Sequence, residues 1–284
     1  MGTNSRVGIL NINPFFDNTI SSIQNKILDL HLNFNQLLII ITGDIFHHKF
    51  VIGSYGLLLY RTFIQQLTKL GRVIIFPGNH CFVQSDTDMP NLLFSSSFEI
   101  DNLIVLNDTK SFIIDNIGFS YVAINTTLDI YRNCGRIHEL PDFPKILDND
   151  VKYKIGLFHG TFANVKLFNG DEISNYTKPY PLEWIKDLNF DFMLLGDIHK
   201  RQLFIYKNTI CGYSGSLIQQ NFGEDIIDHG YLLWHLQNKT VEEINIYNNI
   251  GFINIKQNHK EFNINILQIQ LKIILVLLNP DYKK

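Results

Sequence analysis

Cysteine is scarce in this sequence, with three in 284 residues, at positions 81, 134 and 211. Their spacing matches neither a disulfide framework nor a paired-cysteine zinc site, so we expect a protein of a reducing compartment. An excess of either charge is also lacking, because the net charge is −3. This balance argues against nucleic acid as a partner, because no basic field extends over the whole protein. The argument is weak, because a local basic groove is compatible with a neutral total.

A secretion or membrane signal is missing as well. The first six residues contain no apolar core of a signal peptide. The most apolar stretch, residues 264–278, contains Gln268, Gln270 and Lys272, and its uninterrupted run is too short to span a bilayer. We therefore expect an intracellular protein, cytoplasmic or nuclear, that is not secreted and has no membrane partner.

What the sequence does contain is a repeated pairing of a buried strand with polar residues of metal-ligand type. Five consecutive aliphatic residues at 37–41 predict a strand buried on both faces, and Gly43-Asp44 follows it. Three similar runs lead into Gly78-Asn79-His80, His159-Gly160 and Gly196-Asp197-Ile198-His199. Open α/β sheets place their chemistry at the carboxyl ends of such strands.

A single aspartate after a strand is as often a helix N-cap as a ligand, but four copies favour a shared ligand site. The donors are carboxylate, amide and imidazole groups, and none is a cysteine thiolate. Such donors suit Mn, Fe, Mg or Zn in an open catalytic site better than a structural zinc site.

The remaining pattern predicts an α/β fold. Residues 6–13 predict a first strand that Pro14 stops, and residues 18–30 and 54–70 predict amphipathic helices. With the strands at 37–41 and 73–76 they give the β-α-β-α-β order of a parallel sheet. Alternating segments after residue 199 predict an antiparallel β layer: residues 203–206, 209–211, 231–236 and 241–247.

Taken in this order, the four motifs resemble those of the calcineurin-like metallophosphoesterases. Phe46-His47 after the first aspartate is similar to the SbcD-type DNA repair exonuclease branch, as are residues 213–224 followed by His229. Residues 196–202 are similar to versions of that branch in large DNA viruses. The resemblance implies a four-layer α/β/β/α sandwich over residues 1–255. Residues 256–284 form an apolar tail that is read as a strand or a partner-docking segment, or as the remnant of a longer domain.

The resemblance also implies roles for individual residues around a divalent metal, with Mn²⁺ expected. His80 becomes the catalytic histidine, and His47 supports the positioning of a phosphodiester. The implied metal ligands are Asp44, which bridges two ions, and Asn79, His159, Asp197 and His199.

Two departures from the family pattern bear on activity. Asn11 and Asn13 stand where the family has an Asp-x-His pair for its first metal, and neutral amides are poor ligands beside Asp and His. Cys81 stands where an aspartate commonly follows the catalytic histidine, and we interpret it as a packed, inert thiol. We therefore expect one firm metal site and a second, doubtful one.

The leading functional hypothesis is a metal-dependent phosphodiesterase acting on DNA, as an exonuclease or endonuclease subunit in repair. The candidate partners are DNA, an SbcC-type ATPase subunit and a second copy of this chain. One alternative keeps the fold without full catalysis, as a protein that binds DNA ends or a partner. The other is a phosphatase for small phosphomonoesters.

Overall fold

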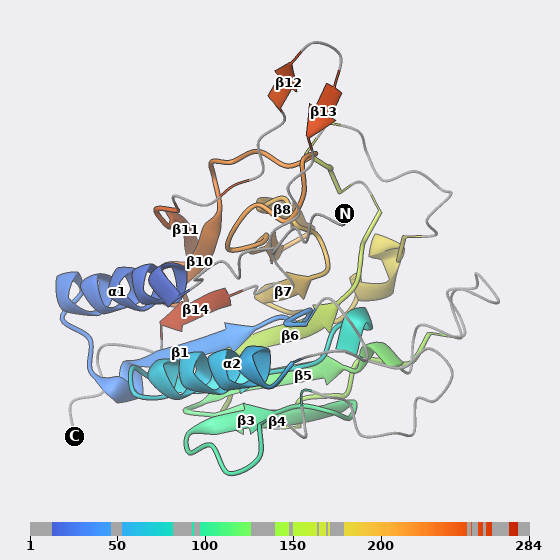
Figure 1. Ribbon diagram of the computed structural model, residues 1–284. Helices are drawn as coiled ribbons and strands as arrows, with labels where there is room; N and C mark the ends of the chain where they lie inside the picture. The colour runs from blue at the N-terminus through green and yellow to red at the C-terminus, as the bar shows by residue number, and fades with distance from the viewer. Residues whose placement is uncertain are drawn as a thin grey trace.

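The computed structural model describes residues 13–46, 53–81, 93, 97–125, 140–147, 150–163, 165–168, 170, 179–248 and 251, and the backbones of residues 255–257, 260–262 and 273–277. Its described part is built on two six-stranded β-sheets. Figure 1 shows helices α1 and α2 lying side by side over the sheet that contains β1.

The first sheet mixes parallel and antiparallel strands. Strands β1, β2 and β3 are parallel, whereas β14 runs antiparallel to β1 and parallel to β10. The spatial order is β11 (Thr240–Asn245), β10 (Gly230–His235), β14 (Ile273–Leu277), β1 (Leu37–Ile41), β2 (Arg72–Ile75) and β3 (Leu103–Val105).

The second sheet has a parallel centre of β5, β6, β7 and β9, with an antiparallel strand at each edge. A separate two-stranded hairpin joins β12 (Ile255–Gln257) to β13 (Lys260–Phe262). The order of the second sheet is β4 (Lys110–Ile114), β5 (Ile117–Val122), β6 (Tyr153–His159), β7 (Phe192–Gly196), β9 (Thr209–Tyr213) and β8 (Gln202–Tyr206).

Three apolar clusters hold the layers together. The central cluster lies between the two sheets and combines residues such as Ile40 of β1, Leu194 of β7 and Trp234 of β10. A second joins the other face of the first sheet to α1 (Asn13–Asp29) and α2 (Ser54–Leu67). The third covers the outer face of the second sheet with residues 140–147 and the short 3-10 helix η5 (Leu182–Ile185). The predicted α/β sandwich class is thus confirmed.

Two sequence-based expectations about single elements are wrong. Asn13 opens helix α1 rather than ending a strand, because Pro14 is tolerated in the first turn of a helix. Asn13 therefore cannot share a strand face with Asn11, which lies outside the described residues. The late alternating segments do not form one layer either, because β8 and β9 join the second sheet while β10 and β11 join the first.

The apolar tail contributes β14, which lies between β10 and β1 inside the first sheet. This placement agrees with the buried-strand interpretation of that segment and puts part of residues 256–284 into the sheet of the preceding chain. The division of the chain at residue 255 is not otherwise tested and stays a prediction.

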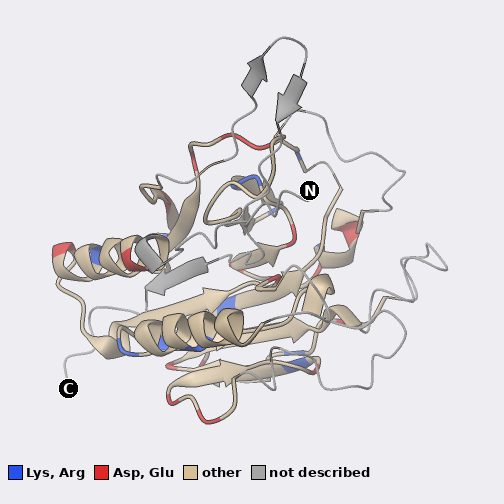
Figure 2. Ribbon diagram, viewed as in Figure 1, with Lys and Arg blue, Asp and Glu red and all other residues tan. Residues whose placement is uncertain are grey.

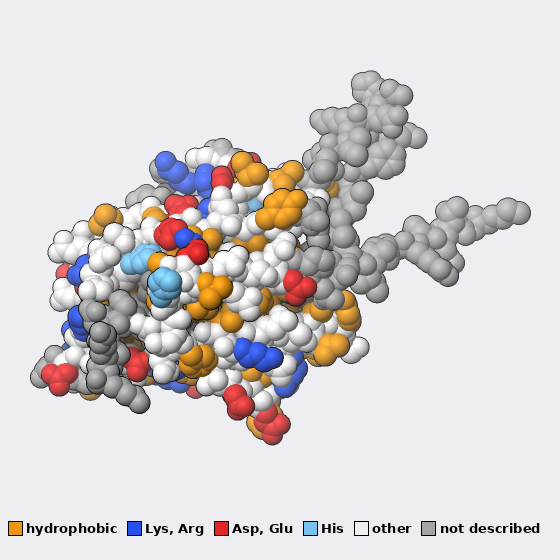
Figure 3. Space-filling view, turned by 90° about the vertical axis from the view of Figure 1, so that its left-hand side faces the viewer, with side chains coloured by type: hydrophobic (Ala, Val, Ile, Leu, Met, Phe, Trp, Pro, Cys, Tyr) orange, Lys and Arg blue, Asp and Glu red, His pale blue; other side chains and the backbone are white. Residues whose placement is uncertain are grey.

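In the views drawn, the described residues form neither a face with charges of one sign nor a large apolar face. In Figure 2 the Lys and Arg of the described chain are interspersed with Asp and Glu. Figure 3 shows hydrophobic side chains in small separate groups on the face that it presents. Among the described helices, none has the length and apolar character needed to cross a membrane.

The central cluster can be tested with one type of substitution at two sites. Leu194 is fully buried, whereas Leu58 of α2 is 61% exposed. We expect Leu194→Ala to lower the free energy of unfolding by about 2–5 kcal/mol, because apolar burial is lost and a cavity remains. Leu58→Ala should change it by about 0.5 kcal/mol or less. Urea denaturation measures both, and equal losses would contradict the central position of Leu194.

Candidate metal centre

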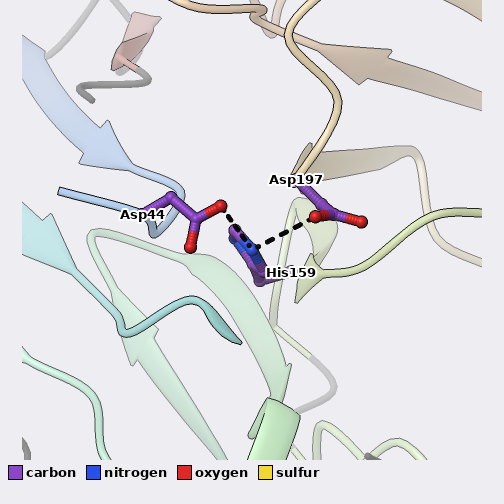
Figure 4. A group of neighbouring side chains, drawn as sticks. All are labelled: Asp44, His159 and Asp197. Carbon is purple, nitrogen blue, oxygen red and sulfur yellow. Dashed lines mark ion pairs between the residues drawn. The ribbon is translucent and has the colours of Figure 1, made fainter. Parts of the chain in front are cut away.

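Three of the predicted ligands meet where strands of the two sheets end. Asp44 follows β1 of the first sheet, His159 is the last residue of β6, and Asp197 follows β7 of the second sheet. One donor atom from each lies within 4.8 Å of the others. Figure 4 shows both carboxylates directed at the imidazole ring of His159 between them.

The hydrogen bonds of His159 define which ring nitrogen faces the carboxylates. Its Nδ1 lies 2.7 Å from the carbonyl oxygen of Thr42, which can only accept, so Nδ1 carries the proton. Its Nε2 lies 3.2 Å from Asp44 Oδ2 and 3.8 Å from Asp197 Oδ1. The shorter contact lacks hydrogen-bond geometry, and Nε2 is a buried atom without a hydrogen-bond partner. In the neutral ring, three electron-pair donors therefore lie close together, and this arrangement fits a cation between them.

A second buried atom without a partner supports the same interpretation. Asn79, in the 3-10 helix η2 (Asn79–Cys81) after β2, has a buried Oδ1 with no hydrogen-bond partner. Unpaired buried polar atoms are costly and therefore uncommon in folded proteins. Two of them, at neighbouring strand ends with two carboxylates, fit a hard divalent cation with oxygen and imidazole ligands.

Close backbone approach at two glycines makes this convergence possible. A Cβ atom on Gly196 would overlap the carbonyl oxygen of Thr42, so the ends of the two sheets can meet only where β7 lacks a side chain. A Cβ atom on Gly78 would overlap Asp44 Oδ1. The absence of a side chain at these glycines thus leaves room for the ligands that follow neighbouring strands.

The two ligand aspartates have left-handed backbone conformations. The φ angle is +51° at Asp44 and +93° at Asp197. Such conformations are uncommon for residues with a side chain, and each costs on the order of 1–3 kcal/mol. The surrounding contacts hold both carboxylates in place against this cost, which is a pattern found at functional sites.

The other predicted residues lie at different distances from this cluster. His80 of η2 donates its backbone N–H to Asp44 Oδ1 over 3.3 Å. His199 lies outside the group of three and lines a neighbouring pocket of about 410 Å³ together with Asp197. His47 lies outside the described residues.

Two polar contacts around the ligands were not predicted from the sequence. Thr161 donates its hydroxyl to Asp197 Oδ2, which leaves Oδ1 directed at His159. Glu224, whose side chain is 4% exposed, accepts a hydrogen bond from His199 Nδ1 at 2.7 Å. Glu224 belongs to the stretch that resembles the nuclease branch, but nothing in the sequence assigned it a partner. Thr161 carries no distinguishing sequence signal.

Two neighbours of the motif histidines are engaged in packing rather than chemistry. Cys81 is buried, and burial followed by the charge of Asp44 raises the pKa of its thiol to about 12, in agreement with an inert thiol. Arg201, which stands two residues after His199, has a side chain that is only 5% exposed and binds Glu243 at 2.9 Å. It is therefore not an open cation there, whereas Lys200 does line the pocket.

The close approach at Gly78 generates a testable expectation. Gly78→Ala should displace Asp44 and lower Mn²⁺ affinity by at least about tenfold, equivalent to about 1.4 kcal/mol. Gly53→Ala is the matched control, because a Cβ at Gly53 would meet nothing within 4 Å. Isothermal titration calorimetry with Mn²⁺ measures both variants. An unchanged affinity in Gly78→Ala would contradict the proposed geometry of Asp44.

Comparisons with known proteins bear on the family of this chain. The chain is 30% identical over 234 residues to the uncharacterized protein R555 of Acanthamoeba polyphaga mimivirus, which covers 81% of this chain but 17% of that protein. The phosphopantetheinyl hydrolase of Mycobacterium tuberculosis matches with 11% identity over 62% of this chain and 77% of its own, at a TM-score of 0.34. The sequence model described as calcineurin-like phosphoesterase matches residues 18–201. The chain therefore belongs to the calcineurin-like phosphoesterase family, whose members hydrolyse phosphoesters with divalent metals.

Proposed function

We propose that this chain is a metal-dependent phosphodiesterase that acts on DNA and belongs to the SbcD-type branch of its family. The observation that carries the metal-dependent part is the convergence of Asp44, His159 and Asp197, with donor atoms within 4.8 Å of one another. This arrangement of two carboxylates around an imidazole fits a divalent cation, and family membership supplies the reaction class.

The residues that would hold the ion are Asp44, Asn79, His159 and Asp197, with His199 on the pocket side. A divalent ion bound there supplies Lewis-acid polarisation of a phosphoryl oxygen and orients the substrate. The protein's own contribution is orientation, because Thr42 and Thr161 hold His159 and Asp197 by hydrogen bonds that leave one donor atom of each free.

His80 is proposed as the proton donor to the departing oxygen. It follows Asn79 directly, and its backbone N–H is held by Asp44. We place its imidazole beside the ligands rather than among them. Such general acid–base assistance is typically worth about 10²–10⁴-fold in rate.

The proposal of DNA as the substrate rests on the residues of two motifs and on local charge. Phe46-His47 and residues 213–224 resemble the nuclease branch. Lys200 lines the pocket next to Asp197 and His199, where a phosphate group would approach. An SbcC-type ATPase or a second copy of this chain as partner, and an intracellular site of action, are proposed on the same resemblance. The chain spans about a sixth of the mimivirus relative's length. The DNA activity is therefore proposed for this chain and is not carried over from that relative.

One observation favours a small phosphomonoester as the second candidate substrate. The pocket beside Asp197 and His199 measures about 410 Å³, and Leu167 and Phe168 give it an apolar wall. A cavity of this size lies within the range that encloses small ligands.

An enzyme with weakened catalysis is the third candidate, because Asn11 and Asn13 lack the strong metal donors of the family motif.

Asp44→Asn and His80→Ala separate metal binding from turnover. Asp44→Asn removes a formal charge from the cluster and should lower Mn²⁺ affinity at least about tenfold, together with activity. His80→Ala should keep Mn²⁺ affinity within about twofold and lower turnover about 10²–10⁴-fold. Calorimetry and Mn²⁺-dependent cleavage of end-labelled duplex DNA measure the two effects. Parallel assays on bis(p-nitrophenyl) phosphate and p-nitrophenyl phosphate identify the substrate class.

The outcomes distinguish the candidates. Cleavage of DNA and of the diester, with little action on the monoester, supports the proposal. Preferential hydrolysis of the monoester favours the small-molecule phosphatase. Mn²⁺ binding without turnover on any substrate favours the weakened enzyme, and unchanged Mn²⁺ affinity in Asp44→Asn would contradict the assigned site.

Lys200→Ala tests the contact with DNA phosphates. If Lys200 neutralises one phosphate, its removal should reduce the slope of log K against log salt by about 0.9 for duplex DNA. Lys207→Ala is the control, since Lys207 pairs with Asp187 on an exposed turn between β8 and β9. Fluorescence anisotropy at several salt concentrations measures both slopes. Equal slopes in the two variants would exclude Lys200 from the DNA contact.

A further inference from the structure

We propose that Glu224 is a positioning residue that holds His199 with its proton on Nδ1 and presents the lone pair of Nε2 to a metal ion in the pocket. The proposal rests on the proposed function and deepens it. It names a residue that lies outside the four strand-end motifs and on which metal affinity nevertheless depends. Glu224 itself touches neither the metal ligands of the buried cluster nor the substrate in this assignment.

The first argument is the hydrogen bond to His199. Glu224 Oε1 lies 2.7 Å from His199 Nδ1, and a carboxylate oxygen is an acceptor. Nδ1 must therefore carry the hydrogen, so in the neutral ring Nε2 is the nitrogen with the free electron pair. Both residues line the pocket with Asp197. The neutral His199 thus adds an electron-pair donor to the lining of the cavity next to a second ligand.

The second argument is that groups other than His199 also donate hydrogen bonds to the carboxylate of Glu224. Its Oε1 also accepts from Asn221 Nδ2 at 2.6 Å, and its Oε2 accepts from the backbone N–H of Gln220 at 2.9 Å. Ser216 Oγ lies 3.5 Å from Oε2 and 3.1 Å from Nδ1 of His229. Because the backbone N–H of Gln220 holds Oε2 with or without Asn221, Oε1 stays directed at His199 and fixes its ring as well as its proton.

The third argument comes from the buried cluster, where His159 is arranged in the same way. The Nδ1 of His159 donates to the carbonyl oxygen of Thr42, and its Nε2 faces the two carboxylates. Outer oxygen acceptors of this kind commonly orient the histidines of metal sites, and their loss costs about 10–100-fold in metal affinity. A backbone carbonyl does this for His159, whereas a side chain that can be substituted does it for His199.

Three variants separate positioning from charge and from loop stability. Glu224→Gln keeps the shape, but its amide cannot accept from both His199 and Gln220. Glu224→Asp keeps the negative charge but is one methylene too short to reach Nδ1. Asn221→Ala is the matched control, because it removes another hydrogen bond to the same carboxylate and leaves His199 untouched.

We expect Mn²⁺ affinity to fall about 10–100-fold in Glu224→Gln and Glu224→Asp and by less than about threefold in Asn221→Ala. Calorimetry of the full chain with Mn²⁺ measures these values, and urea denaturation shows that each variant is folded. The second readout is the tautomer of His199 in metal-free protein, from nitrogen-15 shifts of the ring, assigned by loss of the signals in His199→Gln. The unmodified protein should show a protonated Nδ1, and Glu224→Gln should lose that preference.

The two readouts fail in different ways. A protonated Nε2 in the unmodified protein overturns the role of Glu224 whatever the metal affinity is. An equal loss of affinity in Glu224→Gln and Asn221→Ala also overturns it and shows that Glu224 only stabilises its loop. Retained affinity in Glu224→Asp would show that charge, and not position, matters. An unmodified protein that binds no Mn²⁺ overturns the metal-dependent function, while the tautomer still decides the contact between Glu224 and His199.

Discussion

The site depends on one hydrogen bond between the two sheets, from His159 Nδ1 to the carbonyl oxygen of Thr42. Thr42 directly follows β1 in the first sheet, and His159 ends β6 in the second. The bond joins the layers at their carboxyl ends and also determines which imidazole nitrogen faces Asp44 and Asp197. A backbone contact of the sandwich is therefore also part of the chemistry of its metal centre.

The centre has a buried side and an open side. The side chains of Asp44 and His159 are 2% and 0% exposed, whereas those of Asp197 and His199 are each 26% exposed. A buried carboxylate and imidazole are held rigidly by packing, and their interaction with a cation is strengthened where water is excluded. Within the described part of the chain, the cluster opens on the side of Asp197, where the pocket lies.

Polar groups behind the ligands are distributed unequally between these two sides. On the buried side the holding group is a backbone carbonyl, which is available in any sequence that closes the sandwich. On the open side the holding groups are the side chains of Thr161 and Glu224. The open side is therefore the part of the site that substitutions outside the ligands can tune, and in the proposed function it is also the part that meets the substrate.

Much of the fold and of the metal cluster could be predicted from the sequence. Each of the strands β1, β2, β6 and β7 contains an apolar run, which is the local pattern of a strand with both faces buried. A glycine or a ligand-type residue stands within three positions after each of them, so the placement of Asp44 at the carboxyl end of a strand of the first sheet, and of His159 and Asp197 at the carboxyl ends of strands of the second, follows from the local pattern. These features are local in the chain, which is why sequence patterns are sufficient to detect them.

Only the tertiary structure decided which long-range partners these residues have. The strand that inserts between β10 and β1 comes from the far end of the chain, and the two late hairpins join different sheets. Arg201 follows the motif of His199 but pairs with Glu243, 42 positions later. Glu224 finds His199 across 25 positions. Nothing local marks such contacts, because a charged or polar residue gains its partner only after packing has excluded water around it.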